Sequence, residues 1–307
     1  MGFYAINTSA GILPDKEPIW GIAGTARFGR LGGDIALNYY VDKNHPNAND
    51  ANDGTDPDAP FETIQAAITA SNALIDWADT PSEFNTIWIA PGQYAENLTP
   101  PYYCRMIGTG MATGTTNDIC VNVEPLTGSA MAGTGLGLGL YNMRFTCNDA
   151  NPVLDFGVMN SCIIENCAII DGNPGLATVG IDTTDANSSW IVRTVIKGNS
   201  NPITTGIRST GDFYSCRVIG CEICAVTTGI DLSGAALCGN AVAFRNLIWG
   251  GGAALLATGI NDSVVGDLLC AGNWITATDA INHADAAMTI DNHVQNAGVG
   301  AIETAGT

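Results

Sequence analysis

The sequence predicts an all-β protein, a parallel β-helix whose coils are each about 23–30 residues long. Two observations predict it: short motifs recur in two columns with nearly one period, and charged residues make up only 13% of a glycine-rich chain. So low a charge is poor material for surface helices, which usually carry many Lys and Glu residues. The composition suits short strands joined by turns.

Two interleaved columns of motifs mark the expected coils. Gly-Ile pairs at Gly180, Gly206, Gly229 and Gly259 begin 26, 23 and 30 residues apart. A leucine-rich repeat has a comparable period, but its L-x-x-L-x-L pattern is absent. A second column of small or polar residues, spaced 27, 27, 25 and 27 residues apart, is expected to stack in the interior or at a tight corner: Cys167, Thr194, Cys221, Asn246 and Asn273.

Three regions are expected along the chain. Residues 1–33 read as an extended N-terminal arm, since their apolar residues follow neither a strand nor a helix period. Residues 34–100 form the first part of the β-helix, and residues 101–307 form its coils and a C-terminal closing segment. A flexible tail remains the alternative for the arm. If the arm binds a partner, its basic and aromatic residues are the candidate contacts: Lys16, Trp20, Arg27, Phe28 and Arg30.

The clearest helix is expected over residues 60–75. Pro60 suits its first turn, and Asp58 or Ala59 lies where the N-cap belongs. The apolar residues that follow have helical spacing, so one face of the helix is predicted to be buried.

The loop before this helix, "HPNANDANDGTDPDAP", is rich in Asp and Asn and raises the question of calcium. Its candidate ligands are Asn49, Asp53 and Asp56. With Gly54 at the sixth position of a calcium loop, however, an alanine occupies the third and a proline the twelfth, where oxygen ligands are required. A turn-rich loop stabilised by Asx side chains is the favoured interpretation.

The stretches "YYVDKN", "DGTDPDAPFETIQAAI" and "IWIAPGQYAENL", over about residues 38–98, resemble the start of right-handed β-helices of the pectate-lyase-like superfamily. The resemblance implies a right-handed coil and an α-helix that caps the N-terminal end of the core. It says little about function, because the fold serves lyases, hydrolases, adhesins and phage tailspikes alike.

Within that superfamily the chain is most similar to β-helical virion proteins of tailed bacteriophages, because it has a short arm, no ordinary signal peptide and no catalytic signature. The resemblance implies a non-enzymatic structural protein of the virion, of the capsid decoration (cement) or head-fibre type, anchored by its arm and assembled in the host cytoplasm. It further implies a homotrimer that binds the major capsid protein or another virion protein. Binding of a host surface glycan is compatible with it, and a tail fibre, tailspike or glycan-binding adhesin is the alternative.

A polysaccharide lyase or glycoside hydrolase is a second alternative. Asp182, Arg208 and Asp231 each follow a Gly-Ile pair, so they are expected to stack on consecutive coils. Two coils would separate the carboxylates by about 10 Å, marginal against the roughly 6.5–9.5 Å of inverting glycosidases. An ion ladder on the solvated face, contributing about 0.2–1 kcal/mol per pair, is the favoured interpretation.

The charge of the chain excludes some partners. The formal net charge is −19, which repels phosphate backbones and anionic membranes, so neither nucleic acid nor a membrane is expected as a partner. No segment reaches the roughly 18 apolar residues of a spanning helix. No zinc motif, phosphate loop or dinucleotide fingerprint occurs in a supporting context, so no cofactor is expected.

The ten cysteines are expected to be buried, reduced thiols. Cys162 and Cys167 are five residues apart, about 16 Å on an extended strand, which exceeds the reach of a disulfide. Two coils separate Cys162 from Cys216, so these residues are also too far apart to bond. Unpaired cysteines fit assembly in a reducing cytoplasm.

Overall fold

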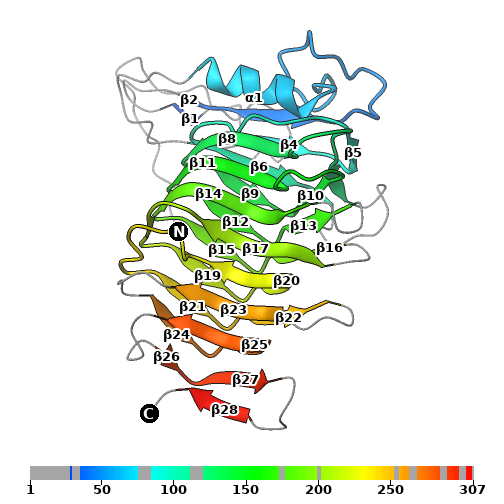
Figure 1. Cartoon of the computed structure of the whole chain (residues 1–307). Helices are drawn as coiled ribbons and strands as arrows, with labels where there is room; N and C mark the ends of the chain where they lie inside the picture. Colours follow the sequence, from blue (N-terminus) through cyan, green and yellow to red (C-terminus); the bar gives the residue numbers. More distant parts are fainter. Residues whose placement is uncertain are drawn as a thin grey trace, which may run out of the picture.

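The computed structural model describes residues 28–29, 35–74, 84–110, 120–172, 177–198, 202–251, 256–262, 268–283, 289–296 and 302–305. These residues form a right-handed parallel β-helix of stacked coils, as the sequence predicted (Figure 1). Each coil of the central region contributes a strand to three successive faces, which we call faces 1, 2 and 3.

Face 1 is a ten-stranded parallel sheet of short strands. Its members in chain order are β3 (Asn38–Val41), β4 (Asn85–Ile89), β6 (Cys104–Gly108), β9 (Gly139–Tyr141), β12 (Ile163–Glu165), β15 (Trp190–Val192), β19 (Arg217–Ile219), β21 (Val242–Phe244), β24 (Leu269–Ala271) and β26 (Thr289–Ile290).

Face 2 follows each face 1 strand after a sharp corner. Its strands are β5 (Gly92–Tyr94), β7 (Val121–Val123), β10 (Met143–Cys147), β13 (Ala168–Asp171), β16 (Val195–Gly198), the first part of β20 (Glu222–Asp231), β22 (Leu247–Gly250), the first part of β25 (Trp274–His283) and β27 (Asn292–Asn296). The antiparallel strand β28 (Ile302–Ala305) pairs with β27 and follows it at the C-terminal end of the stack (Figure 1).

Face 3 completes each coil. It contains β8 (Met131–Leu136), β11 (Leu154–Asn160), β14 (Val179–Asn187), β17 (Ile203–Ser209), β18 (Phe213–Tyr214), β23 (Leu256–Asp262) and the second parts of β20 and β25. Outside the helix, β1 (Phe28–Gly29) and β2 (Ile35–Ala36) form a small antiparallel pair.

The core is built from columns of identical side chains. Ile169, Ile196, Ile223, Ile248 and Ile275 lie in register on successive strands of face 2, and all five are fully buried. A β-branched side chain suits both the pleated strand and the contact with its own kind on the next coil. One coil therefore covers the apolar surface of the next.

The Gly-Ile column has a steric cause. A Cβ atom on Gly206 would lie 2.3 Å from Cγ2 of Ile223 and 2.5 Å from the carbonyl oxygen of Gly229. Gly180 and Gly229 meet the same two obstacles in their own coils. Only a hydrogen atom fits where face 3 approaches face 2, so the glycine recurs once per coil.

The corners on either side of face 1 are held in the left-handed backbone conformation, which is rare for residues other than glycine. At the corner before face 1 the φ angles lie between 49° and 60° at Gly137, Ser161, Ser188, Ser215 and Asn240. At the corner after face 1 they lie between 48° and 63° at Asn142, Asn166, Arg193, Gly220, Arg245, Gly272 and Asp291.

The column of small or polar residues lies immediately after the second corner. Cys167, Thr194, Cys221, Asn246 and Asn273 are all buried there. In this column the amide of Asn246 donates to Oδ1 of Asn273 over 3.0 Å, and the amide of Asn273 donates to Oδ1 of Asn292 over 2.8 Å. The stack therefore satisfies backbone and side-chain polar groups that the corner buries.

Helix α1 (Ile64–Asn72) is shorter than the predicted 60–75. The prediction of an N-cap at Asp58 or Ala59 was wrong: Thr63 is the N-cap, and its Oγ1 accepts from the backbone N–H of Ala66 over 3.2 Å. Phe61 does not start the helix because it forms a β-bridge with Val41.

Two carboxylates hold the first turn of α1. Glu96 accepts from the backbone N–H groups of Ile64 and Gln65 over 3.0 and 2.9 Å, and Asp50 accepts from that of Thr63 over 2.8 Å. Negative charge is favourable at this end of a helix dipole. Desolvation raises the pKa of Glu96, so its burial costs some of this gain. The helix covers the N-terminal end of the stack (Figure 1).

Most of the predicted arm lies outside the described residues, including Lys16, Trp20, Arg27 and Arg30. Phe28 is described as part of β1, which pairs with β2. No helix in the described part of the chain is both long enough and apolar enough to cross a bilayer.

Replacing Asn273 by Ala is expected to destabilise the fold by about 3 kcal/mol, because it strands the buried N–H groups of Asn246 and the carbonyl of Ala243. The matched control is Asn282→Ala on the exposed outer surface, which should change stability by less than about 0.5 kcal/mol. Urea denaturation of both variants measures the difference, and equal stabilities would contradict a structural role for the stack.

Candidate functional site

A column of polar residues runs along the outer surface of face 3. The strand register aligns Asp155 with Asp182, Asp182 with Arg208, Arg208 with Asp231, and Asp231 with Asn261. The Gly-Ile motif places these residues, because the position after the isoleucine turns outward on β14, β17, β20 and β23. The structure thus brings Asp182, Arg208 and Asp231 onto consecutive coils.

Asp182 and Arg208 form a two-point ion pair. Nε of Arg208 donates to Oδ1 of Asp182 over 2.8 Å, and Nη2 donates to Oδ2 over 2.6 Å. The hydrogen bonds to Asp182 are the largest cause of a raised pKa of the Arg208 guanidinium. The side chains are 38% and 17% exposed for Arg208 and Asp182, so the pair is partly withdrawn from water yet reachable.

Asp155 extends the column by one coil, and the sequence analysis missed it. Asp155 follows Val153-Leu154 and therefore lacks the Gly-Ile motif that marks the other members of the column. Its spacing of 27 residues from Asp182 equals the coil period and could have indicated its place in the column. Burial raises the pKa of the Asp155 carboxyl, the charge of Asp182 raises it further, and Arg208 lowers it.

Asp231 lies apart from this group. Its Oδ1 accepts from the backbone N–H of Ser233 over 3.1 Å and from the amide of Asn261 over 3.3 Å. Two coils separate it from Asp182, which corresponds to about 10 Å between strands. The close pair of carboxylates on this face is therefore Asp155 with Asp182, and the suggested pairing of Asp182 with Asp231 is the wider one.

The Asp/Asn-rich loop is organised by its own backbone. Oδ1 of Asn49, Asp53 and Asp56 each accepts from the N–H two residues later, over 2.9 Å in all three cases. These are Asx turns, which direct the side-chain oxygens to the backbone of the loop itself. Across the described residues, no group of three or more His, Cys, Asp or Glu side chains is placed to hold a metal ion.

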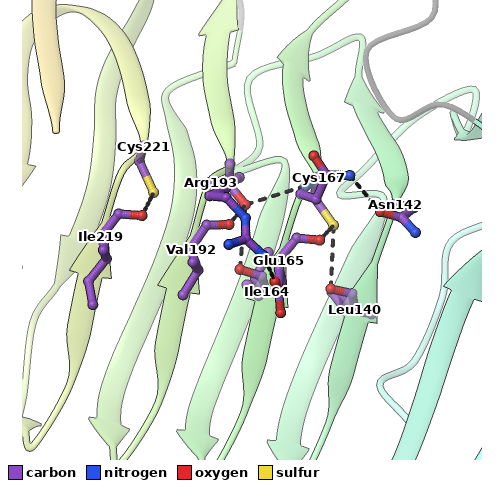
Figure 2. A network of polar contacts seen from close by, with 11 residues as sticks. Leu140, Asn142, Ile164, Glu165, Cys167, Val192, Arg193, Ile219 and Cys221 are labelled. Carbon is purple, nitrogen blue, oxygen red and sulfur yellow. Dashed lines mark hydrogen bonds and ion pairs between the residues drawn. The ribbon is translucent and has the colours of Figure 1, made fainter. Parts of the chain in front are cut away.

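The cysteines in the column of small or polar residues make hydrogen bonds to backbone carbonyls, as Figure 2 shows for Cys167 and Cys221. Sγ of Cys167 lies 3.5 Å from the carbonyl oxygen of Leu140, and Sγ of Cys221 lies 3.6 Å from that of Ile219. Burial raises the pKa of Cys167 to about 12 and that of Cys221 to about 11. All ten cysteines are buried and free of disulfides, so they are structural groups.

The fold of the chain, a parallel β-helix, also occurs in solved structures of other proteins. It is similar to a pectin methylesterase from carrot, with 13% identity and a TM-score of 0.44 over 90% of this chain and 87% of that one. It is also similar to the rice weevil pectin methyl esterase, with 11% identity and a TM-score of 0.38 over 77% and 87%. A pectin methylesterase from Erwinia chrysanthemi matches at 11% identity and a TM-score of 0.37, over 78% and 79%.

These likenesses concern the fold alone. Comparisons of the sequence with protein families and with curated proteins give no match. The expectation of a non-enzymatic chain finds no support in these likenesses, since all three structures are by name pectin methylesterases, which are enzymes.

The buried thiols are expected to be unreactive in the native protein. A pKa of about 11 for Cys221, against 9.0 for an ordinary thiol, lowers its thiolate fraction at pH 8 by about 10²-fold. Iodoacetamide labelling followed by peptide mass spectrometry should therefore leave Cys221 and Cys167 unmodified until the protein is denatured. Native labelling at the denatured rate would show that the stack is open to solvent.

Proposed function

We propose that the chain is a carbohydrate-acting enzyme, a glycoside hydrolase whose reacting groups are Asp155 and Asp182 on face 3. The observation that carries the proposal is a pair of carboxylates on adjacent coils whose surroundings differ. A polysaccharide lyase is the related possibility on the same face.

The spacing of the two carboxylates supports a retaining mechanism. Asp155 and Asp182 are direct partners in the parallel register of β11 and β14. Neighbouring strands lie about 4.8 Å apart. Retaining glycosidases hold their two carboxyl groups about 5–5.5 Å apart, whereas inverting enzymes need about 6.5–9.5 Å. The pair therefore matches the shorter distance.

The surroundings assign different roles to the two groups. Burial and the charge of Asp182 raise the pKa of Asp155, which favours its protonated form and suits a general acid. Asp182 accepts two hydrogen bonds from Arg208, one on each oxygen, and each oxygen keeps a further lone pair. Arg208 is thus a positioning residue, and Asp182 is the nucleophile.

In the first step a carboxylate oxygen of Asp182 bonds to the anomeric carbon while the glycosidic C–O bond breaks. The bond electrons pass to the departing oxygen, which takes the proton of Asp155. In the second step water attacks the same carbon, Asp155 accepts a proton from that water, and the ester bond to Asp182 breaks. Both aspartates return to their starting states.

Asp155→Asn and Asp182→Asn are each expected to lower kcat by about 10²–10⁴-fold on a cleaved polysaccharide, because each removes a reacting group. Activity should fall at high pH as Asp155, whose pKa is raised by burial and by the charge of Asp182, loses its proton. Reducing-sugar assays on neutral and acidic glycans across pH values measure both effects.

The control for this prediction is Asp231→Asn, which removes a carboxylate from the same column without touching the pair. It should keep most of the activity. If Asp231→Asn loses activity and Asp155→Asn keeps it, the reacting pair is Asp182 with Asp231 instead. No cleavage of any polysaccharide by the intact protein would contradict an enzymatic role.

We also propose, as a second candidate compatible with the first, that the protein is a virion component of a tailed phage, a decoration protein, head fibre or tailspike. The ten cysteines are buried and form no disulfide, which suits a chain that folds in a reducing host cytoplasm. The major capsid protein or another virion protein would be the binding partner of residues 1–33.

Removal of residues 1–33 is expected to abolish attachment to the particle, because the arm would supply the contact. Co-sedimentation of the intact and shortened proteins with phage particles measures it, and circular dichroism checks that the shortened chain keeps its β-helix. Equal co-sedimentation of the intact and shortened proteins would contradict an anchoring role of the arm.

A further inference from the structure

The outer surface of face 1 differs from the rest of the molecule. Residues on its strands alternate between the core and the outside, and many of the outward residues are large and apolar. Trp88, Trp190 and Ile290 are 36%, 41% and 52% exposed. Exposed apolar side chains that recur along one face are more often part of a binding site than single scattered ones.

Basic residues gather on the same surface. Four of the eight Lys and Arg residues in the described part of the chain lie on face 1 or at its corner: Arg105, Arg193, Arg217 and Arg245. All four are exposed. Two acidic residues occupy the same strands and corners: Glu165, which pairs with Arg193 (Figure 2), and Asp291 at the last corner. Face 1 is therefore positive in a chain whose net charge is −19.

Arg217 and Arg245 lie over aromatic rings. The guanidinium carbon of Arg217 lies 4.8 Å from the ring centre of Trp190, its register partner on β15. That of Arg245 lies 4.8 Å from the ring of Phe244. A ring contact of this kind helps to hold the guanidinium in place for binding a carboxylate. Little side-chain entropy remains to be lost on binding.

We propose that face 1 is an interface with a second copy of this chain. Aromatic and Arg residues are enriched at protein interfaces, whereas Lys, Glu and Asp are depleted, and face 1 has this composition. An acidic second copy supplies the carboxylates that the arginines would bind, so the charges are complementary.

The contact is heterologous: face 1 of one copy meets a different face of the next. Two copies of face 1 placed against one another would bring Arg against Arg, which is unfavourable. Face 2 offers a suitable counterpart, because Glu222, Leu247 and Trp274 lie in register on its outer side, with Leu247 42% and Trp274 51% exposed. A heterologous contact closes into a ring or extends as a chain.

The test is the triple variant Arg193→Gln, Arg217→Gln, Arg245→Gln, measured by sedimentation velocity at 50 mM and 500 mM salt. The intact chain should associate, more weakly at high salt, and the variant should have a dissociation constant at least about 10²-fold higher. Trp274→Ser tests the counterpart surface and should also weaken association.

The control makes the same change of charge on face 3: Thr184→Glu, Thr204→Glu, Thr227→Glu, all at exposed positions. Circular dichroism verifies the fold of each variant. Association in the control and its loss in the arginine variant supports the proposal. An intact chain that is monomeric at both salt concentrations overturns the proposal, even if face 1 then proves to bind an anionic polysaccharide. Equal weakening of association by the control variant also overturns it.

Discussion

The whole structure depends on the parallel pairing of one coil with the next. Each strand has its hydrogen-bond partners on neighbouring coils, so a residue type that suits one coil must suit its neighbours at the same place. The isoleucine column of face 2 and the glycines at Gly180, Gly206 and Gly229 follow from this constraint. The isoleucines fill the core, and the glycines allow face 3 to approach face 2.

The same pairing turns single polar residues into columns. In the interior, Asn246 and Asn273 share hydrogen bonds along the axis and satisfy the buried corner. On the surface, Asp155, Asp182 and Arg208 become neighbours although 26 or 27 residues separate them in the chain. Stability and candidate chemistry thus have one origin, since both require side chains repeated at the period of the coil.

The three faces divide the surface by chemistry. Face 3 carries carboxylates and one engaged arginine, as at Asp182 and Arg208. Face 1 carries arginines stacked on rings, as at Arg217 and Trp190. The proposed active site on face 3 and the proposed self-association surface are mutually compatible, because a contact made through face 1 and face 2 leaves face 3 exposed. A narrow solenoid of this shape therefore has room for two separate roles.

The sequence by itself determined the parallel β-helix, because its motif period is the length of a coil and repeats in two columns. It also placed Asp182, Arg208 and Asp231 on consecutive coils, since each follows a Gly-Ile pair. Only the tertiary structure decided that Asp155 joins them and which groups bond, because register and burial depend on packing between coils. The start of α1 at Ile64 was likewise decided by a distant bridge between Phe61 and Val41.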